Sequence, residues 1–122
     1  MVALGFGAQS HAAVYQLVGD DTITLTTYYA TKSTKTHSVT GNAKLITKGH
    51  KPTSKKSSVA RLYIDVYKVK DGKETLIKSY SETGDMVTKD QSHVFDVGSK
   101  KTTIKVKYWG DYKASFQSRI YD

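Results

Sequence analysis

The chain has 122 residues, no cysteine and a formal net charge of +8. This length suits one domain with a core of its own. The lack of cysteine excludes disulfide frameworks, thiolate metal sites and thiol catalysis, and no apolar run is long enough for a membrane-spanning helix. The positive charge favours an anionic partner, such as acidic lipid or the phosphate-rich polymers of a bacterial cell wall.

Residues 1–13 have features of the end of a secretory signal peptide. Small apolar residues come first, and Ser10 and Ala12 then supply the small side chains that a signal peptidase requires. An apolar N-terminal strand is the alternative interpretation. We therefore expect a secreted, extracellular bacterial protein in which residues 14–122 form a single domain. Secretion makes nucleic acid the least expected of the anionic partners.

Alternation with a period of two predicts β-strands along most of the chain. The strand expected over residues 22–30 places Ile23, Leu25, Thr27 and Tyr29 on one face. Weaker alternation predicts strands at residues 14–18, 37–40 and 43–47.

A β-hairpin is predicted between Val59 and Ser81. Its first strand has two faces, one with Leu62, Ile64 and Val66 and the other with Arg61, Tyr63, Asp65 and Tyr67. Asp71 and Gly72 follow, and this pair tolerates the positive φ angles of a tight hairpin turn. A second apolar run then resumes at Thr75, so the two segments are expected to pair.

The C-terminal part is predicted to contain strands at residues 93–97, 102–109 and 112–122, with a basic turn at residues 98–101. The last strand is expected to pair with its predecessor. By contrast, residues 48–58 contain the only proline, four lysines and no apolar side chain, which predicts a surface loop.

Seven or eight short strands with frequent turns predict an all-β fold, an antiparallel β-sandwich, with a small barrel as the alternative. A homodimer in which edge strands of two copies pair is a further possibility that the sequence leaves undecided. Alternation identifies the faces of a strand and leaves its neighbours undetermined.

No motif places catalytic residues in a working geometry. The four histidines are spread over the chain, and the carboxylates of Glu74, Glu82, Asp85 and Asp90 flank predicted turns and loops. We therefore expect no metal, no cofactor and no enzymatic activity. An enzyme that degrades an extracellular polymer, with two hidden carboxylates, is the weaker alternative.

Aromatic and basic residues share the exposed strand faces of a chain with nine tyrosines and one tryptophan. Such faces can stack on sugar rings or lie at a lipid headgroup layer while ammonium groups neutralise phosphate. The alternative is that tyrosine simply favours strands and lysine protects strand edges. The candidate binding residues are Lys35, His37, Lys48, Lys51, Lys55, Lys56, Arg61, Tyr63, Tyr67, Lys105, Lys107 and Trp109.

Tyr28-Tyr29, followed by the segment from Lys35 to Thr40, resembles the tyrosine-rich strand and Lys-x-His-Ser segment of the lactococcin 972 family. These are small secreted bacteriocins with an all-β sandwich fold and no cysteine. The resemblance implies an antibacterial protein that acts on a cell-wall precursor without an enzymatic step, with Lys35 and His37 as the residues carried over.

The expected function is thus that of a secreted, cationic, non-enzymatic protein, similar to a bacteriocin, that binds an anionic cell-wall polymer, a cell-wall precursor or a membrane surface. A non-toxic module that binds extracellular carbohydrate or cell wall is the alternative. Loss of binding with added salt would indicate contacts made largely by lysine.

Overall fold

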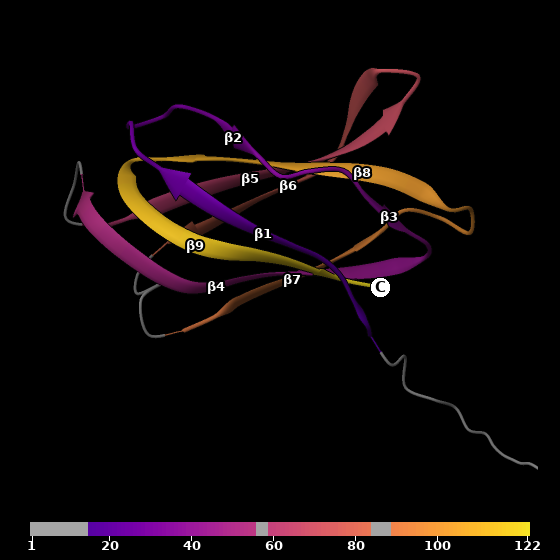
Figure 1. The fold of residues 1–122 in the computed structure, drawn as a ribbon, viewed down its shortest axis with the longest axis horizontal. Coiled ribbons are helices and arrows are strands. Elements are labelled where there is room, and N and C mark those ends of the chain that lie inside the picture. The colour runs from indigo at the N-terminus through magenta and orange to yellow at the C-terminus, as the bar shows by residue number, and fades with distance from the viewer. Residues whose placement is uncertain (1–14, 56–58, 84–88) are drawn as a thin grey trace, which may run out of the picture.

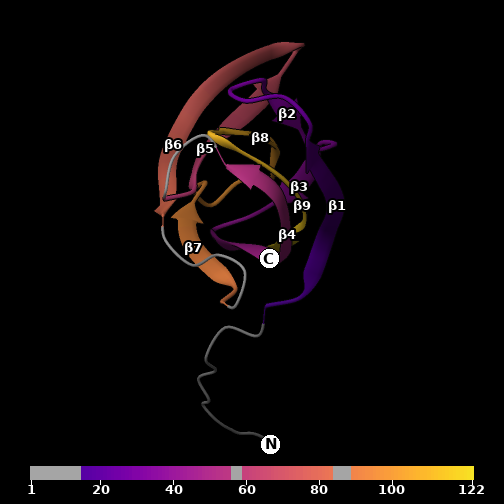
Figure 2. The same cartoon turned by 90° about the vertical axis from the view of Figure 1, so that its left-hand side faces the viewer.

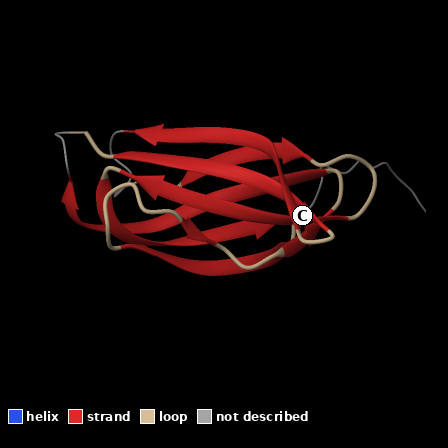
Figure 3. Cartoon of the chain, turned by 90° about the horizontal axis from the view of Figure 1, so that it is seen from above, coloured by secondary structure: helices blue, strands red, loops and turns tan. Residues whose placement is uncertain are grey.

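The computed structural model describes residues 15–55, 59–83 and 89–122, which form two antiparallel β-sheets packed face to face (Figure 1). The predicted all-β sandwich is therefore confirmed. Figure 3 shows the strands along the length of the molecule, and no helix occurs in the described ranges. In this part of the chain, no helix is long and apolar enough to cross a membrane.

Nine strands in the described ranges make up the two sheets. In chain order they are β1 (Leu17–Leu25), β2 (Lys32–Ser33), β3 (His37–Val39), β4 (Asn42–Lys55), β5 (Arg61–Lys70), β6 (Lys73–Thr83), β7 (Gln91–Asp96), β8 (Thr102–Gly110) and β9 (Tyr112–Tyr121). The β9 sheet has the order β1-β9-β4-β7, and the β8 sheet has the order β2-β8-β5-β6 with β3 also paired to β8. Figure 2 shows β6 and β7 on one flank of the sandwich and β1 on the opposite flank.

The core lies between the sheets and follows the predicted alternation. Leu62, Ile64 and Val66 of β5 are fully buried, as the sequence predicted for one face of the hairpin. Tyr108 of β8 and Phe116 of β9 meet edge to face with ring centroids 5.1 Å apart, so they join the two sheets. The period of two identified the inward side chains because each sheet has one buried face.

The predicted β-hairpin is confirmed as β5 and β6. Asp71 and Gly72 form its turn with φ angles of 53° and 75°. Both angles lie in the left-handed region, as a tight turn that matches the twist of the strands requires. Residues opposite one another include Ile64 and Tyr80.

The predicted pairing of the last strand with its predecessor is wrong. β9 pairs with β1 and β4, whereas β8 lies in the other sheet. Asp111, at the crossover, is buried and accepts a hydrogen bond from the backbone N–H of Arg61 at 2.7 Å. A Cβ on Gly110 would lie 2.4 Å from the carbonyl oxygen of Arg61, so only glycine fits this close approach.

The loop predicted over residues 48–58 is also wrong as far as Lys55, because β4 continues to that residue and pairs with β9. The register shifts on both sides of the Lys51–Pro52 step, and Gly49 has a φ of 67°. β7 pairs with β4 only up to Thr47, so beyond it β4 borders β9 alone among the described strands. Proline is tolerated at a strand edge or bulge, which explains how Pro52 is accommodated. Residues 56–58 lie outside the described ranges.

The two strands predicted over residues 14–18 and 22–30 are a single strand, β1, that ends at Leu25. Ile23 and Leu25 are buried as expected. Tyr29 instead lies beyond the strand, with a φ of 64° and 53% of its residue surface exposed. The predictions for residues 1–13 and for Val14 fall outside the described residues.

Candidate functional site

Six outward side chains of β5 and β8 form a surface that we name the β5–β8 face. They are Tyr63, Asp65, Tyr67, Lys105, Lys107 and Trp109. The strand register sets Tyr63 opposite Trp109, and their rings stack with centroids 5.5 Å apart and an interplanar angle of 23°. The ammonium group of Lys107 lies 4.7 Å from the ring centroid of Tyr67. The predicted combination of aromatic and basic side chains thus occurs on one face.

Glu74 of β6 balances the lysines of this face. Its carboxylate accepts hydrogen bonds from Lys105 at 2.9 Å and from Lys107 at 2.6 Å. The bonds to Lys107 and then Lys105 lower the pKa of Glu74, and the bond to Glu74 raises the pKa of Lys107. Because Asp65 adds a second carboxylate, the two lysines are matched by two acids and the face is not strongly cationic.

A shallow hollow of about 390 Å³ lies on the same side of the molecule. Its lining residues are Tyr29, Thr31, Asp65, Tyr67, Lys107 and Trp109. The segment after β1 borders it, and the backbone N–H of Tyr29 donates to the carbonyl of Gly110 at 2.7 Å. A non-glycine residue with positive φ is uncommon, so the exposed ring of Tyr29 is held here at a cost in backbone strain.

The other predicted binding residues do not join this face. Arg61 lies at the end of β5, where its Nε pairs with Asp111 at 3.0 Å. Lys48, Lys51 and Lys55 lie on β4 in the opposite sheet, and Lys48 pairs with Asp90 at 3.4 Å. Lys56 lies outside the described residues. The twelve candidates are therefore divided between separate regions.

Lys35 and His37 lie at the edge of the β8 sheet, where β2 and β3 pair with β8, at the flank beside β1. His37 is half-buried, and its Nε2 lies 2.6 Å from Oδ2 of Asp21 in β1. The backbone N–H of Lys35 donates to the other oxygen of Asp21 at 3.2 Å. A Cβ on Gly19 would lie 2.8 Å from the His37 ring, so the ring packs on bare backbone. This arrangement gives His37 a structural contact between the two sheets.

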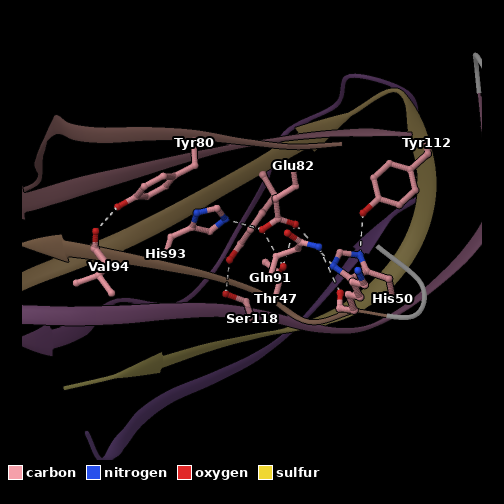
Figure 4. Close-up of polar contacts among 11 residues, drawn as sticks. Thr47, His50, Tyr80, Glu82, Gln91, His93, Val94, Tyr112 and Ser118 are labelled. Carbon is pink, nitrogen blue, oxygen red and sulfur yellow. Dashed lines mark hydrogen bonds and ion pairs between the residues drawn. The ribbon is translucent and has the colours of Figure 1, made fainter. Parts of the chain in front are cut away.

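A second group of polar residues lies inside the sandwich, and we name it the Glu82 cluster. It comprises Thr47, His50, Glu82, His93 and Tyr112 (Figure 4). Thr47 Oγ1 lies 2.9 Å from each carboxylate oxygen of Glu82, and His93 Nε2 lies 2.8 Å from Oε2. An ionised carboxylate can only accept, so His93 donates through Nε2. Glu82 belongs to the β8 sheet and its partners to the β9 sheet, so the cluster fastens the two sheets together.

His50 is the buried histidine of the cluster, and among the described residues only one of its two ring nitrogens has a hydrogen-bond partner. Its Nδ1 lies 2.9 Å from the hydroxyl of Tyr112, and its ring stacks on Phe116. Its Nε2 is buried without a hydrogen-bond partner, 3.9 Å from Oε1 of Glu82. Burial lowers the pKa of His50, and the charge of Glu82 opposes this shift. Burial also raises the pKa of Tyr112, so that hydroxyl stays protonated.

The cluster corrects two expectations from the sequence. Two of the four histidines do gather around one carboxylate, and Glu82 lies in the core rather than beside a loop. No group of three metal-binding side chains in a geometry for an ion occurs among the described residues. The contacts of Glu82 with Thr47 and His93 link the two sheets within the core.

The sequence missed Glu82 and His50 for identifiable reasons. The predicted hairpin ended at Ser81, one residue before Glu82, although Tyr80 and Glu82 continue the period of two. His50 falls in the predicted loop because residues 48–58 contain the only proline, four lysines and no apolar side chain. A β-bulge at this point turns the side chain of His50 into the core. An alternating pattern in the sequence does not show where such a bulge occurs.

No protein-family model and no curated protein matches the chain. The functional argument therefore depends on the two groups of residues described above.

Proposed function

We propose that the protein is a non-enzymatic binding protein that holds a glycan of a bacterial cell envelope, outside the cell, on its β5–β8 face. The observation that carries the proposal is the stacked pair of Tyr63 and Trp109 on an open face beside a hollow. Both rings are fixed by opposite positions on paired strands. The two aromatic side chains therefore lose little conformational freedom when a ligand binds, which favours affinity.

Sugar rings present C–H groups on one side and hydroxyl groups around the edge. An aromatic platform covers the apolar side, while the polar edge needs hydrogen-bond partners. Asp65, Tyr67 and Lys107 line the hollow and offer such partners next to Trp109. The two lysines of the face already contact Glu74, so this surface suits the sugar part of a polymer better than its charged groups.

The same hollow supports binding rather than hydrolysis. Asp65 is the carboxylate in its lining, and its Oδ1 accepts a hydrogen bond from Ser79 at 2.7 Å. Glycoside hydrolysis by the common mechanisms uses two carboxylates on either side of the bond. A binding role needs no such pair.

Trp109 is the only tryptophan of the chain, so its fluorescence reports directly on the proposed surface. Soluble fragments of bacterial cell-wall glycan should change its emission in a saturable manner. Tyr63→Ala should weaken this binding about tenfold, which corresponds to the loss of one stacking contact. Tyr121→Ala, on the outward side of β9, is the matched control and should bind normally. Unchanged emission with every glycan tested would contradict the proposal.

Inhibition of bacterial growth is a second candidate function, favoured by the net charge of +8. A cationic protein that attaches to an anionic envelope accumulates there. Purified protein should then slow the growth of Gram-positive bacteria, and Tyr63→Ala should act less. If no strain in a broad panel responds while Trp109 still reports glycan binding, the protein is a binding module without toxicity.

A further inference from the structure

A lysine-rich groove lies at one end of the sandwich, between the β5–β6 hairpin and the turn from β7 to β8. Its volume is about 560 Å³. Its lining residues are Lys68, Val69, Lys70, Val97, Gly98, Ser99, Lys100, Lys101, Thr102 and Thr103. Figure 1 shows the two turns at the same end of the molecule. Four lysines thus line one groove, and no carboxylate is among its lining residues in the described part of the chain.

The backbone holds the β7–β8 turn in place. Gly41 accepts a hydrogen bond from the N–H of Val97 at 2.9 Å and donates one to the carbonyl of Gly98 at 2.7 Å. Asp96 accepts the N–H of Gly98 at 2.8 Å, and the hydroxyl of Thr102 donates to the carbonyl of Lys100. The backbone that carries Lys100 and Lys101 is therefore ordered before any ligand arrives, which lowers the entropy cost of binding.

The charges of this groove are not balanced locally. Within the described part of the chain, no carboxylate lies within ion-pair distance of Lys68, Lys70, Lys100 or Lys101, in contrast to Lys105 and Lys107. The hairpin register also sets Lys70 opposite Lys73. Like charges at opposite positions destabilise a strand pair. An anion in the groove would relieve this repulsion.

We propose that this groove binds consecutive phosphate groups of a polyol-phosphate polymer. Several phosphates joined in a chain can contact several ammonium groups at once, whereas a single small anion cannot. Among the residues that the structure describes, no aromatic side chain lines the groove, and single-stranded nucleic acids are usually held by stacking of their bases on aromatic rings. The hydroxyl groups of Ser99 and Thr103 add neutral partners for phosphate or polyol oxygens.

The inference depends on the groove alone and not on the glycan proposed for the β5–β8 face. The two sites have separate readouts, because emission from Trp109 reports the face and binding of a labelled polymer reports the groove. Failure of one proposal therefore leaves the other open to its own test.

The test measures binding of fluorescently labelled poly(glycerol phosphate) by anisotropy between 50 and 200 mM salt, with single-stranded poly-dT of equal phosphate number as the comparison. Four lysine contacts predict a slope of log affinity against log salt of about −3. The Lys100→Gln/Lys101→Gln variant should bind about tenfold more weakly at 50 mM salt, with a slope of about −1.5. Lys32→Gln/Lys89→Gln, which removes the same charge at exposed positions elsewhere, should bind as the wild type does.

Three results would overturn the proposal. Equal losses in the two double variants would show that net charge, not the groove, drives binding. Tighter binding of poly-dT would assign the groove to nucleic acid. Absence of salt-dependent binding by the wild-type protein would exclude a phosphate site without recourse to any variant.

Discussion

Two glutamates of the same strand, β6, show how position decides what a carboxylate does in this protein. Glu74 lies on the outer surface, where Lys105 and Lys107 bind it. Glu82 lies eight residues further along in the core, where its side chain is 1% exposed and Thr47 and His93 bind it from the opposite sheet. Both carboxylates are well bonded, but water competes for only one of them.

This difference separates stability from recognition. Removal of a partner from a buried polar group leaves other groups without hydrogen bonds, and no water replaces them. Removal of a partner on the surface frees a group that water or a ligand can contact. We therefore expect changes in the Glu82 cluster to affect folding and changes on the β5–β8 face to affect binding.

Glu82→Ala should have the largest effect. The free energy of unfolding is expected to fall by about 3 kcal/mol, because His93 and Thr47 lose their shared partner inside the sandwich. Urea unfolding followed by circular dichroism measures this change. Glu74→Ala is the matched control on the same strand and should leave the unfolding curve nearly unchanged. Equal losses in the two variants would refute the distinction.

Trp109→Ala should have the converse effect. The affinity for glycan is expected to fall about tenfold, because half of the stacked platform is removed. The urea midpoint should change much less than in Glu82→Ala, since Trp109 is on the outer side of its sheet. Retention on glycan-coated beads measures binding without the tryptophan signal. Undiminished retention would count against the β5–β8 face as the binding surface.

Acid should destabilise the protein through His50. Because its folded-state pKa lies below the ordinary value of 6.5, the unfolded chain takes up this proton more readily than the folded chain. The stability that comes from neutral His50 is fully present above pH 6.5 and is lost as the pH falls below that value. His50→Gln should therefore lose less stability than the wild type between pH 7 and pH 5, as measured by urea unfolding. Parallel losses in both proteins would contradict the assignment.

Glu74→Gln should have the smallest effect. It removes the acceptor charge shared by Lys105 and Lys107, so the β5–β8 face becomes more positive. Binding of a glycan that carries phosphate should strengthen about two- to threefold at low salt, and binding of an uncharged glycan should not. Side-by-side titrations with the two ligands measure the difference. An equal gain for both would indicate a change of shape rather than of charge.

The two regions also differ in how far the sequence alone could predict them. Tyr63, Tyr67, Lys105 and Lys107 occupy alternate positions within two strands, and each strand has one buried face. Their shared outward face follows once those strands pair. The neutralising contact of Glu74 depends on a third strand, whose register includes a shift between Val66 and Tyr67. Alternation gives no sign of such a shift.

The sequence by itself determined most of the strands, their inward and outward faces and the hairpin turn at Asp71 and Gly72, because period and turn chemistry are local properties. Tertiary structure alone decided that β9 leaves β8 for the other sheet and that His50 and His93 meet Glu82. It also decided that lysines from the end of β5 and from the β7–β8 turn line one groove. These contacts join residues far apart in the chain, and the packing of the two sheets selects them.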